Sequence, residues 1–239
     1  MRPLALLVAP LLFATQAFAV LPPLLADSAA LDRAFIPALM LSNGKDLAKA
    51  RVAHETYEKA WTVFAAAHAD AKRAPVFAGI EAANGRARAA LEGAKSAAAH
   101  GAQEEVRHAL WQLRRDLKLT YLPDLLTTYH ETMEEIVLGT AKLEPARIGP
   151  ADVARLKTLS ATARREWKAI ADTSWDPADY GFDAARVETF RAGIAAETKA
   201  LDDLDAALAS GEGERIAKAA AAVKPPYART YATFGRFPG

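Results

Sequence analysis

The chain has 239 residues, of which 51% are hydrophobic, and it carries 30 basic against 29 acidic side chains. This near-neutral balance gives no electrostatic reason for binding nucleic acid or an anionic membrane surface. The sequence contains no cysteine, which excludes disulfides, thiolate metal ligands and covalent haem attachment through Cys-x-x-Cys-His.

Residues 1–19 have the pattern of a secretory signal peptide. A basic start at Arg2 is followed by an apolar run over 4–13 and by the small-x-small sequence Ala17-Phe18-Ala19. No other stretch approaches the roughly 20 apolar residues that a membrane helix needs. We therefore expect cleavage near Val20 and export to the periplasm without a membrane anchor.

The rest of the chain has the composition of an all-α protein. Alanine, leucine, lysine, arginine and glutamate dominate, and the alternation typical of strands is absent. Glycine and proline mark the expected helix ends, for example at Asn43-Gly44, Gly101 and Gly149-Pro150. We expect helices over 27–41, 44–71, 76–99, 102–118, 121–141, 151–171, 182–209, 212–223 and 226–235.

The longest break between expected helices, 172–182, divides the chain into an N-terminal helical region, 20–172, and a C-terminal hairpin region, 173–239. A weak internal repeat supports two parts, because 91–101 and 201–211 both run a helix into a glycine. Similar composition of alanine-rich hairpins is the alternative explanation. We predict an antiparallel helical bundle packed as one compact unit, with two related four-helix-bundle-like halves as the form that the repeat favours.

The C-terminal hairpin carries a family resemblance. The segments that carry it are Phe190-Arg191-Ala192-Gly193-Ile194, 201–208, 211–219 and Tyr227-Ala228-Arg229-Thr230-Tyr231. They resemble the last two helices of the periplasmic soluble b-type cytochromes, which are four-helix bundles related in fold to the cytochromes c-prime. The resemblance implies a bundle of antiparallel helices joined by short loops. The haem-binding histidine of that family corresponds to Ala228 here, and Met40 is only roughly placed as its methionine ligand, so haem binding does not follow.

Histidines supply the remaining chemistry. Three of the five lie one helical turn from a carboxylate: His54 with Glu58, His108 with Glu104 and Glu105, and His130 with Glu134. His54 lies within an apolar stripe and His130 at the edge of one, whereas His108 points away from its stripe. We predict that His54, Glu58, His130 and Glu134 converge in the core and hold a transition metal ion such as copper, iron or zinc. The alternative is that each imidazole is a core group bonded to one carboxylate or tyrosine hydroxyl.

No catalytic motif is visible, because the sequence has no Gly-x-Ser-x-Gly, no cysteine nucleophile and no duplicated Glu-x-x-His. The basic pairs Arg114-Arg115 and Arg164-Arg165 are interpreted as solvated helix faces. We therefore expect no enzymatic activity, and interpret the chain as a periplasmic binding protein for a metal ion or small ligand. Two alternatives stay open: a structural or partner-interaction protein accessory to a periplasmic redox or transport system, and a non-covalent haem protein using His54 or His130.

Overall fold

The computed structural model describes residues 22–115, 118 and 120–239, and every regular element in them is helical. The prediction of an all-α helical bundle is therefore confirmed. The helices are α1 (Pro23–Ser42), α2 (Leu47–His68), α3 (Ala74–Glu92), α4 (Ser96–Arg115), α5 (Leu122–Ala141), α6 (Pro150–Asp172), α7 (Ala184–Ser210), α8 (Gly213–Ala222) and α9 (Lys224–Ala232), with short 3-10 helices η1 (Pro145–Arg147) and η2 (Pro177–Tyr180). Among these helices, none combines the length and the apolar character needed to cross a membrane.

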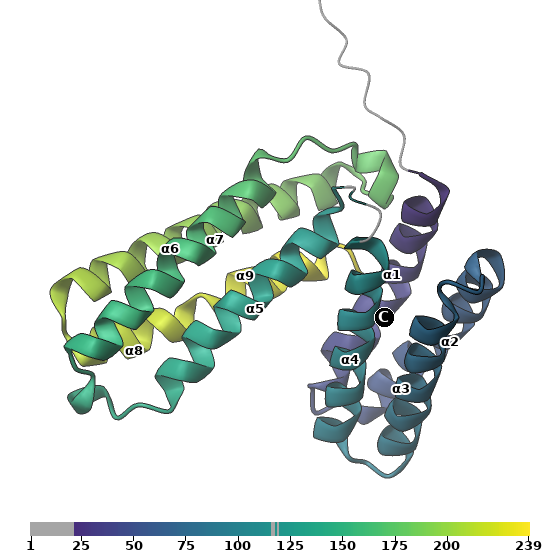
Figure 1. Cartoon of the computed structure of the whole chain (residues 1–239), viewed down its shortest axis with the longest axis horizontal. Helices are drawn as coiled ribbons and strands as arrows, with labels where there is room; N and C mark the ends of the chain where they lie inside the picture. The colour runs from purple at the N-terminus through teal and green to yellow at the C-terminus, as the bar shows by residue number, and fades with distance from the viewer. Residues whose placement is uncertain (1–21, 116–117, 119) are drawn as a thin grey trace, which may run out of the picture.

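The helices form two bundles that are contiguous in sequence (Figure 1). Helices α1–α4 make the first bundle, in which α1 packs on α2 and α3 packs on α4. Helices α5–α9 make the second, in which α8 and α9 follow one another and together fill the place of a fourth helix. The bundles are steeply inclined to each other and meet where α1 and α4 contact α5 and α9.

The break expected at 172–182 to divide the chain occurs at 173–183, within the second bundle, between α6 and α7, which pack against each other. This connection is tightly packed. Trp175, Tyr180 and Phe182 form an aromatic cluster with one another, and Phe234 packs on the last two of them. The longest irregular segment therefore does not separate the two bundles, because its aromatic side chains pack against the core of the second one.

The helix end predicted at Gly101 is wrong. Gly101 lies inside α4, and the break occurs instead after α3, at 93–95. There Ala94 adopts a left-handed φ of 54°, and the Lys95 amide donates to the Ala90 carbonyl at 2.8 Å. Gly93 follows the last residue of α3, but the left-handed position of the turn is taken by Ala94, so no glycine marks that position.

One apolar cluster runs through both bundles, from Leu24 in α1 to Phe234 after α9. Trp61 and Trp167 are large buried side chains in it, one in each bundle. The indole of Trp61 donates to Glu81 at 2.5 Å, and that of Trp167 donates to the Ile194 carbonyl at 3.2 Å. Both rings therefore bury their apolar bodies while their N–H groups stay satisfied.

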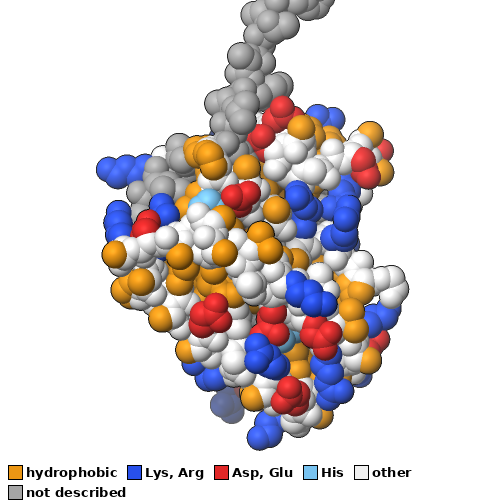
Figure 2. All heavy atoms as spheres, turned by 90° about the vertical axis from the view of Figure 1, so that its right-hand side faces the viewer, with side chains coloured by type: hydrophobic (Ala, Val, Ile, Leu, Met, Phe, Trp, Pro, Cys, Tyr) orange, Lys and Arg blue, Asp and Glu red, His pale blue; other side chains and the backbone are white. Residues whose placement is uncertain are grey.

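Figure 2 shows the side of the first bundle on which α2 and α3 lie, with basic and acidic side chains interspersed among apolar ones. Val52 and Val63 of α2 are among the exposed apolar residues. Ion pairs cross the surface between helices, such as Arg88 with Glu58. Exposed pairs of this kind contribute little to stability.

Helices α7 and α9 approach closely at Gly193. A Cβ there would lie 3.1 Å from the Thr230 Cβ and closer still to its Oγ1. We expect Gly193→Ala to lower the free energy of unfolding by about 1–3 kcal/mol in urea denaturation, because the helices must shift. Gly79→Ala in α3 is the matched control, since a Cβ there meets nothing within 4 Å, and it should stabilise by about 0.5–1 kcal/mol. Equal effects of the two substitutions would contradict the importance of the close approach.

Candidate functional site

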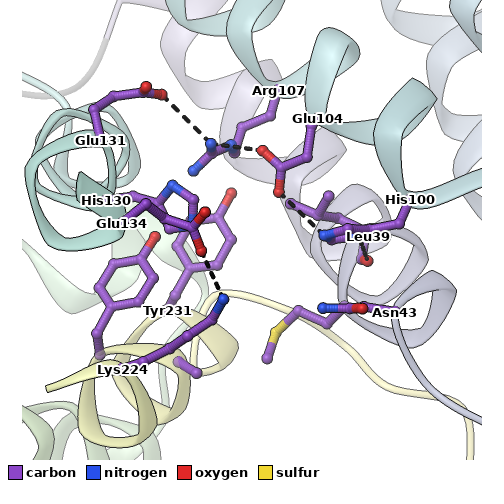
Figure 3. A pocket seen from close by; sticks show the side chains of 13 residues that line it. Leu39, Asn43, His100, Glu104, Arg107, His130, Glu131, Glu134, Lys224 and Tyr231 are labelled. Carbon is purple, nitrogen blue, oxygen red and sulfur yellow. Dashed lines mark hydrogen bonds and ion pairs between the residues drawn. The ribbon is translucent and has the colours of Figure 1, made fainter. Parts of the chain in front are cut away.

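A pocket of about 350 Å³ lies where the two bundles meet (Figure 3). Its walls include Leu39 and Met40 of α1, His100, Glu104 and Arg107 of α4, His130, Glu131 and Glu134 of α5, and Lys224, Tyr227 and Tyr231 of α9. We call this the interbundle pocket. Most of its polar side chains are ionisable, and they come from three helices of the two bundles.

On the first bundle's side, α4 presents His100, Glu104 and Arg107, which share one face of the helix because they are spaced i, i+4 and i+7. The His100 Nδ1 lies 3.2 Å from the Leu39 carbonyl oxygen and 3.2 Å from the Ser42 Oγ. Its Nε2 lies 3.6 Å from the Glu104 Oε1. The imidazole is thus anchored to α1 through one nitrogen while the other is directed at Glu104.

Arg107 is the most deeply placed cation of the pocket, with a side chain only 7% exposed. Its Nη2 lies 2.6 Å from the Glu104 Oε2 and 3.5 Å from the Glu131 Oε1. Both carboxylates are thus held by one terminal nitrogen, and the buried Nε has no hydrogen-bond partner in the described part of the chain. Leaving a guanidinium N–H unsatisfied in a buried position costs free energy.

On the second bundle's side, His130 and Glu134 of α5 lie one turn apart, with the Nε2 of the histidine 3.7 Å from the Glu134 Oε1. The Lys224 ammonium of α9 donates to that same oxygen at 2.6 Å. Burial, together with the positive charges of Arg107, Lys224 and His100, lowers the pKa of His130 to about 2. His130 is therefore a neutral imidazole at physiological pH.

Two phenols from α9 complete the wall. The rings of Tyr227 and Tyr231 stack with centroids 5.9 Å apart, and the Tyr227 ring lies 5.3 Å from the His130 ring. Burial raises the pKa of the Tyr227 hydroxyl, against the opposing effect of Arg107, so the group stays protonated and is a hydrogen-bond donor. That hydroxyl is buried and has no partner of good geometry among the described residues.

The four residues predicted to bind a metal together are not brought together. His54 and Glu58 lie on α2 in the first bundle, whereas His130 and Glu134 lie on α5 and line the interbundle pocket. Within residues 22–115, 118 and 120–239, no group of three or more His, Asp or Glu is placed to hold a metal ion. The physical reason is that α2 and α5 face the interiors of different bundles.

The pair that faces His130 and Glu134 is His100 with Glu104, as Figure 3 shows. Their i, i+4 spacing was visible in the sequence. The helix end predicted at Gly101 separated them, however, and so removed them from consideration. His108, predicted to point away from the core, is exposed, and that prediction is confirmed.

His54 belongs to a separate cluster of buried polar side chains in the first bundle. Its Nδ1 accepts from the Gln103 amide at 2.7 Å, and its Nε2 lies 3.5 Å from the Glu58 Oε1. Burial lowers the pKa of His54, and the charge of Glu58 opposes that effect. Nearby Tyr57 and Asn84 also carry buried polar atoms without a partner of good geometry in the described chain. Ordered water commonly satisfies such groups, so this cluster does not by itself indicate a ligand site.

Comparisons with protein-family models, curated proteins and solved structures found no match to this chain. The described residues that line the interbundle pocket include no serine, threonine or cysteine. Arg, Lys, Glu, Tyr and a neutral His supply charge complementarity and directed hydrogen bonds. The arrangement is therefore suited to holding a polar molecule.

Proposed function

We propose that this protein is an exported, non-catalytic binding protein that holds a small polar ligand in the interbundle pocket. The observation that carries the proposal is the convergence of ionisable side chains from both bundles on one cavity of about 350 Å³. Small-molecule sites in proteins typically have volumes of about 300–1,000 Å³ and a few convergent polar groups. Export is part of the proposal and is supported by the signal-peptide pattern of residues 1–19.

The free-energy cost of burying polar groups in the wall of the pocket favours a binding role over a purely structural one. A contact that only joined two bundles would be most stable if apolar, since each unsatisfied buried polar group costs about 1–3 kcal/mol. Here a guanidinium nitrogen of Arg107 and the Tyr227 hydroxyl are buried without a partner of good geometry, and His130 is held neutral. Ionisable groups perturbed in this way concentrate at functional sites.

The test is a ligand screen on the mature protein without a histidine tag. Thermal unfolding is followed with a panel of small polar metabolites, with copper, iron and zinc salts, and with haem. A ligand at 100 times its Kd stabilises the fold by about 2.7 kcal/mol, which gives a clear rise in Tm. We expect at least one small metabolite to bind the wild type, and to bind Glu134→Gln at least tenfold more weakly.

His108→Gln is the control, because His108 is exposed on α4 and does not line the interbundle pocket. It should bind the metabolite as the wild type does. If no metabolite binds, or if Glu134→Gln has no effect on the one that does, the proposal is wrong. A Soret band with haem, or metal uptake lost in His130→Gln, would favour the haem or metal alternative.

A further inference from the structure

The C-terminal end of the chain crosses from the second bundle to the first. Phe234, which follows α9, still belongs to the aromatic cluster of the second bundle. From there the chain passes to α1, where the Arg236 amide donates to the Arg33 carbonyl at 2.7 Å. Figure 1 shows the chain end lying beside α1, beyond the end of α9. We call residues 235–239 the strap.

A proline within α1 makes the acceptor for that bond. In an α-helix each carbonyl accepts from the amide four residues later. Four residues after Arg33 the chain has Pro37, which has no N–H to donate. The Arg33 carbonyl thus lacks its donor within the helix, and the Arg236 amide of the strap takes that place. Helix α1 therefore carries a docking point for one backbone amide, and the strap occupies it.

Gly235 fits the strap against the same proline. A Cβ at position 235 would lie 3.0 Å from the Pro37 Cδ and 3.1 Å from the Ile36 Cγ2, which is closer than side chains normally pack. Gly235 is buried, whereas Arg236 and Phe237 after it are exposed. Chain ends are usually loose unless they are tied down, and this one is tied down to α1 at Gly235 and Arg236.

Arg33 holds a second segment of the second bundle as well. Its guanidinium Nη1 donates at 3.2 Å to the carbonyl of Tyr180, which lies in η2 between α6 and α7. Further along α1, Leu39 and Met40 line the interbundle pocket, and Figure 3 shows Leu39 across the cavity from Tyr231 of α9. The position of α1 against the second bundle therefore determines how far apart two walls of the pocket lie.

We propose that the strap holds the interbundle pocket closed through its bond to α1, and that its release lets α1 and α9 separate and opens the pocket. The bond belongs to an exposed chain end, so it can break without unfolding either bundle. Buried links such as those of Arg114 with Asp32 and Asp124 keep the bundles joined while the strap is released. The inference concerns access to the pocket and holds whatever ligand binds there.

The absence of cysteine allows the opening to be measured directly. Val52→Cys on α2 and Leu138→Cys on α5 place two thiols at exposed positions, one in each bundle. Spin labels on these thiols report the distance between the bundles by pulsed electron paramagnetic resonance. All further substitutions are made in this labelled mature protein, for which we expect a single narrow distribution of distances.

Two matched pairs of variants test the strap. Arg236→Pro removes the amide proton that Arg33 accepts, whereas Arg236→Ala keeps it and removes only an exposed side chain. Gly235→Val puts a branched side chain against Pro37, whereas Gly239→Val adds one where a Cβ meets nothing within 4 Å. We expect the first member of each pair to broaden the distribution at least twofold toward longer distances, and the second to leave it unchanged. Circular dichroism should show the same helix content in all four, because the strap lies outside the helices.

Distributions that coincide in all of these proteins would overturn the inference, because the buried links alone would then set the arrangement of the bundles. It is also wrong if Arg236→Ala or Gly239→Val broadens the distribution as much as its partner does. Lower helix content in Arg236→Pro or Gly235→Val would show that the strap is part of the folded core and cannot be released from it. None of these measurements uses a ligand, so the strap can fail while the binding function stands, and the reverse.

Discussion

Arg114→Ala is expected to lower the free energy of unfolding by about 3–5 kcal/mol at neutral pH, because it leaves buried carboxylates without their cation. Arg114 of α4 is only 4% exposed, and its guanidinium lies 3.4 Å from Asp32 of α1 and 2.7 Å from Asp124 of α5. The Tyr121 hydroxyl donates to Asp32 at 2.7 Å, so one polar network joins the two bundles. Urea denaturation of wild type and variant at pH 7 measures the loss.

The pH dependence of this loss tests its electrostatic origin. Burial raises the pKa of Asp124 to about 6 even though Arg114 lowers it, and removing Arg114 removes that opposing effect. A protonated Asp124 needs no cation, so the loss should be smaller at pH 4 than at pH 7. A loss of the same size at both values would contradict the charge argument. Arg164→Ala, which removes a more exposed partner of Asp202 and Asp205, is the control and should cost at most about 1 kcal/mol.

The second large effect is a loss of stability in acid that depends on His130. Its pKa is about 2 in the folded protein against an ordinary value of 6.5, so between these values the unfolded chain binds a proton that the folded protein does not. The free energy of unfolding is therefore unaffected by this group above pH 6.5, and below that value it decreases by about 1.4 kcal/mol for each pH unit. In His130→Gln, one proton fewer is taken up on unfolding. The free energy of unfolding should therefore fall less steeply between pH 6 and pH 4 than in the wild type.

Urea denaturation at a series of pH values measures these slopes in the wild type and in His130→Gln. The comparison cancels the other titrating groups, which are common to both proteins. His108→Gln, at an exposed position on α4, is the control for the substitution itself. Identical slopes for the wild type and His130→Gln would show that His130 titrates normally in the folded protein.

The helical fold was predictable because it depends on local signals. Apolar spacing and alanine-rich composition indicated the helices, and Asn43-Gly44 and Gly149-Pro150 lie where α1 ends and α6 begins. The arrangement into two bundles was not predictable in this way. An apolar stripe shows that one face of a helix is buried, but it does not show against which helix.

The same limit explains why only two of the four residues predicted to bind a metal line the interbundle pocket. His130 and Glu134 were identified from their spacing and their position at the edge of a stripe, but the pair assigned to face them lies in the other bundle. Arg114 was interpreted as solvated, and it is buried. A long basic side chain carries no sequence signal for burial, because its environment depends on the carboxylates that distant helices bring to it.

The apolar cluster shared by both bundles links their unfolding. The bundles cannot part without exposing some of that common core to water, so each bundle is more stable in the presence of the other. The chain should therefore lose its structure in a single cooperative transition rather than bundle by bundle. Since the walls of the interbundle pocket belong to α4 on one side and to α5 and α9 on the other, the pocket exists only in the intact pair, and the binding proposed for it requires both bundles.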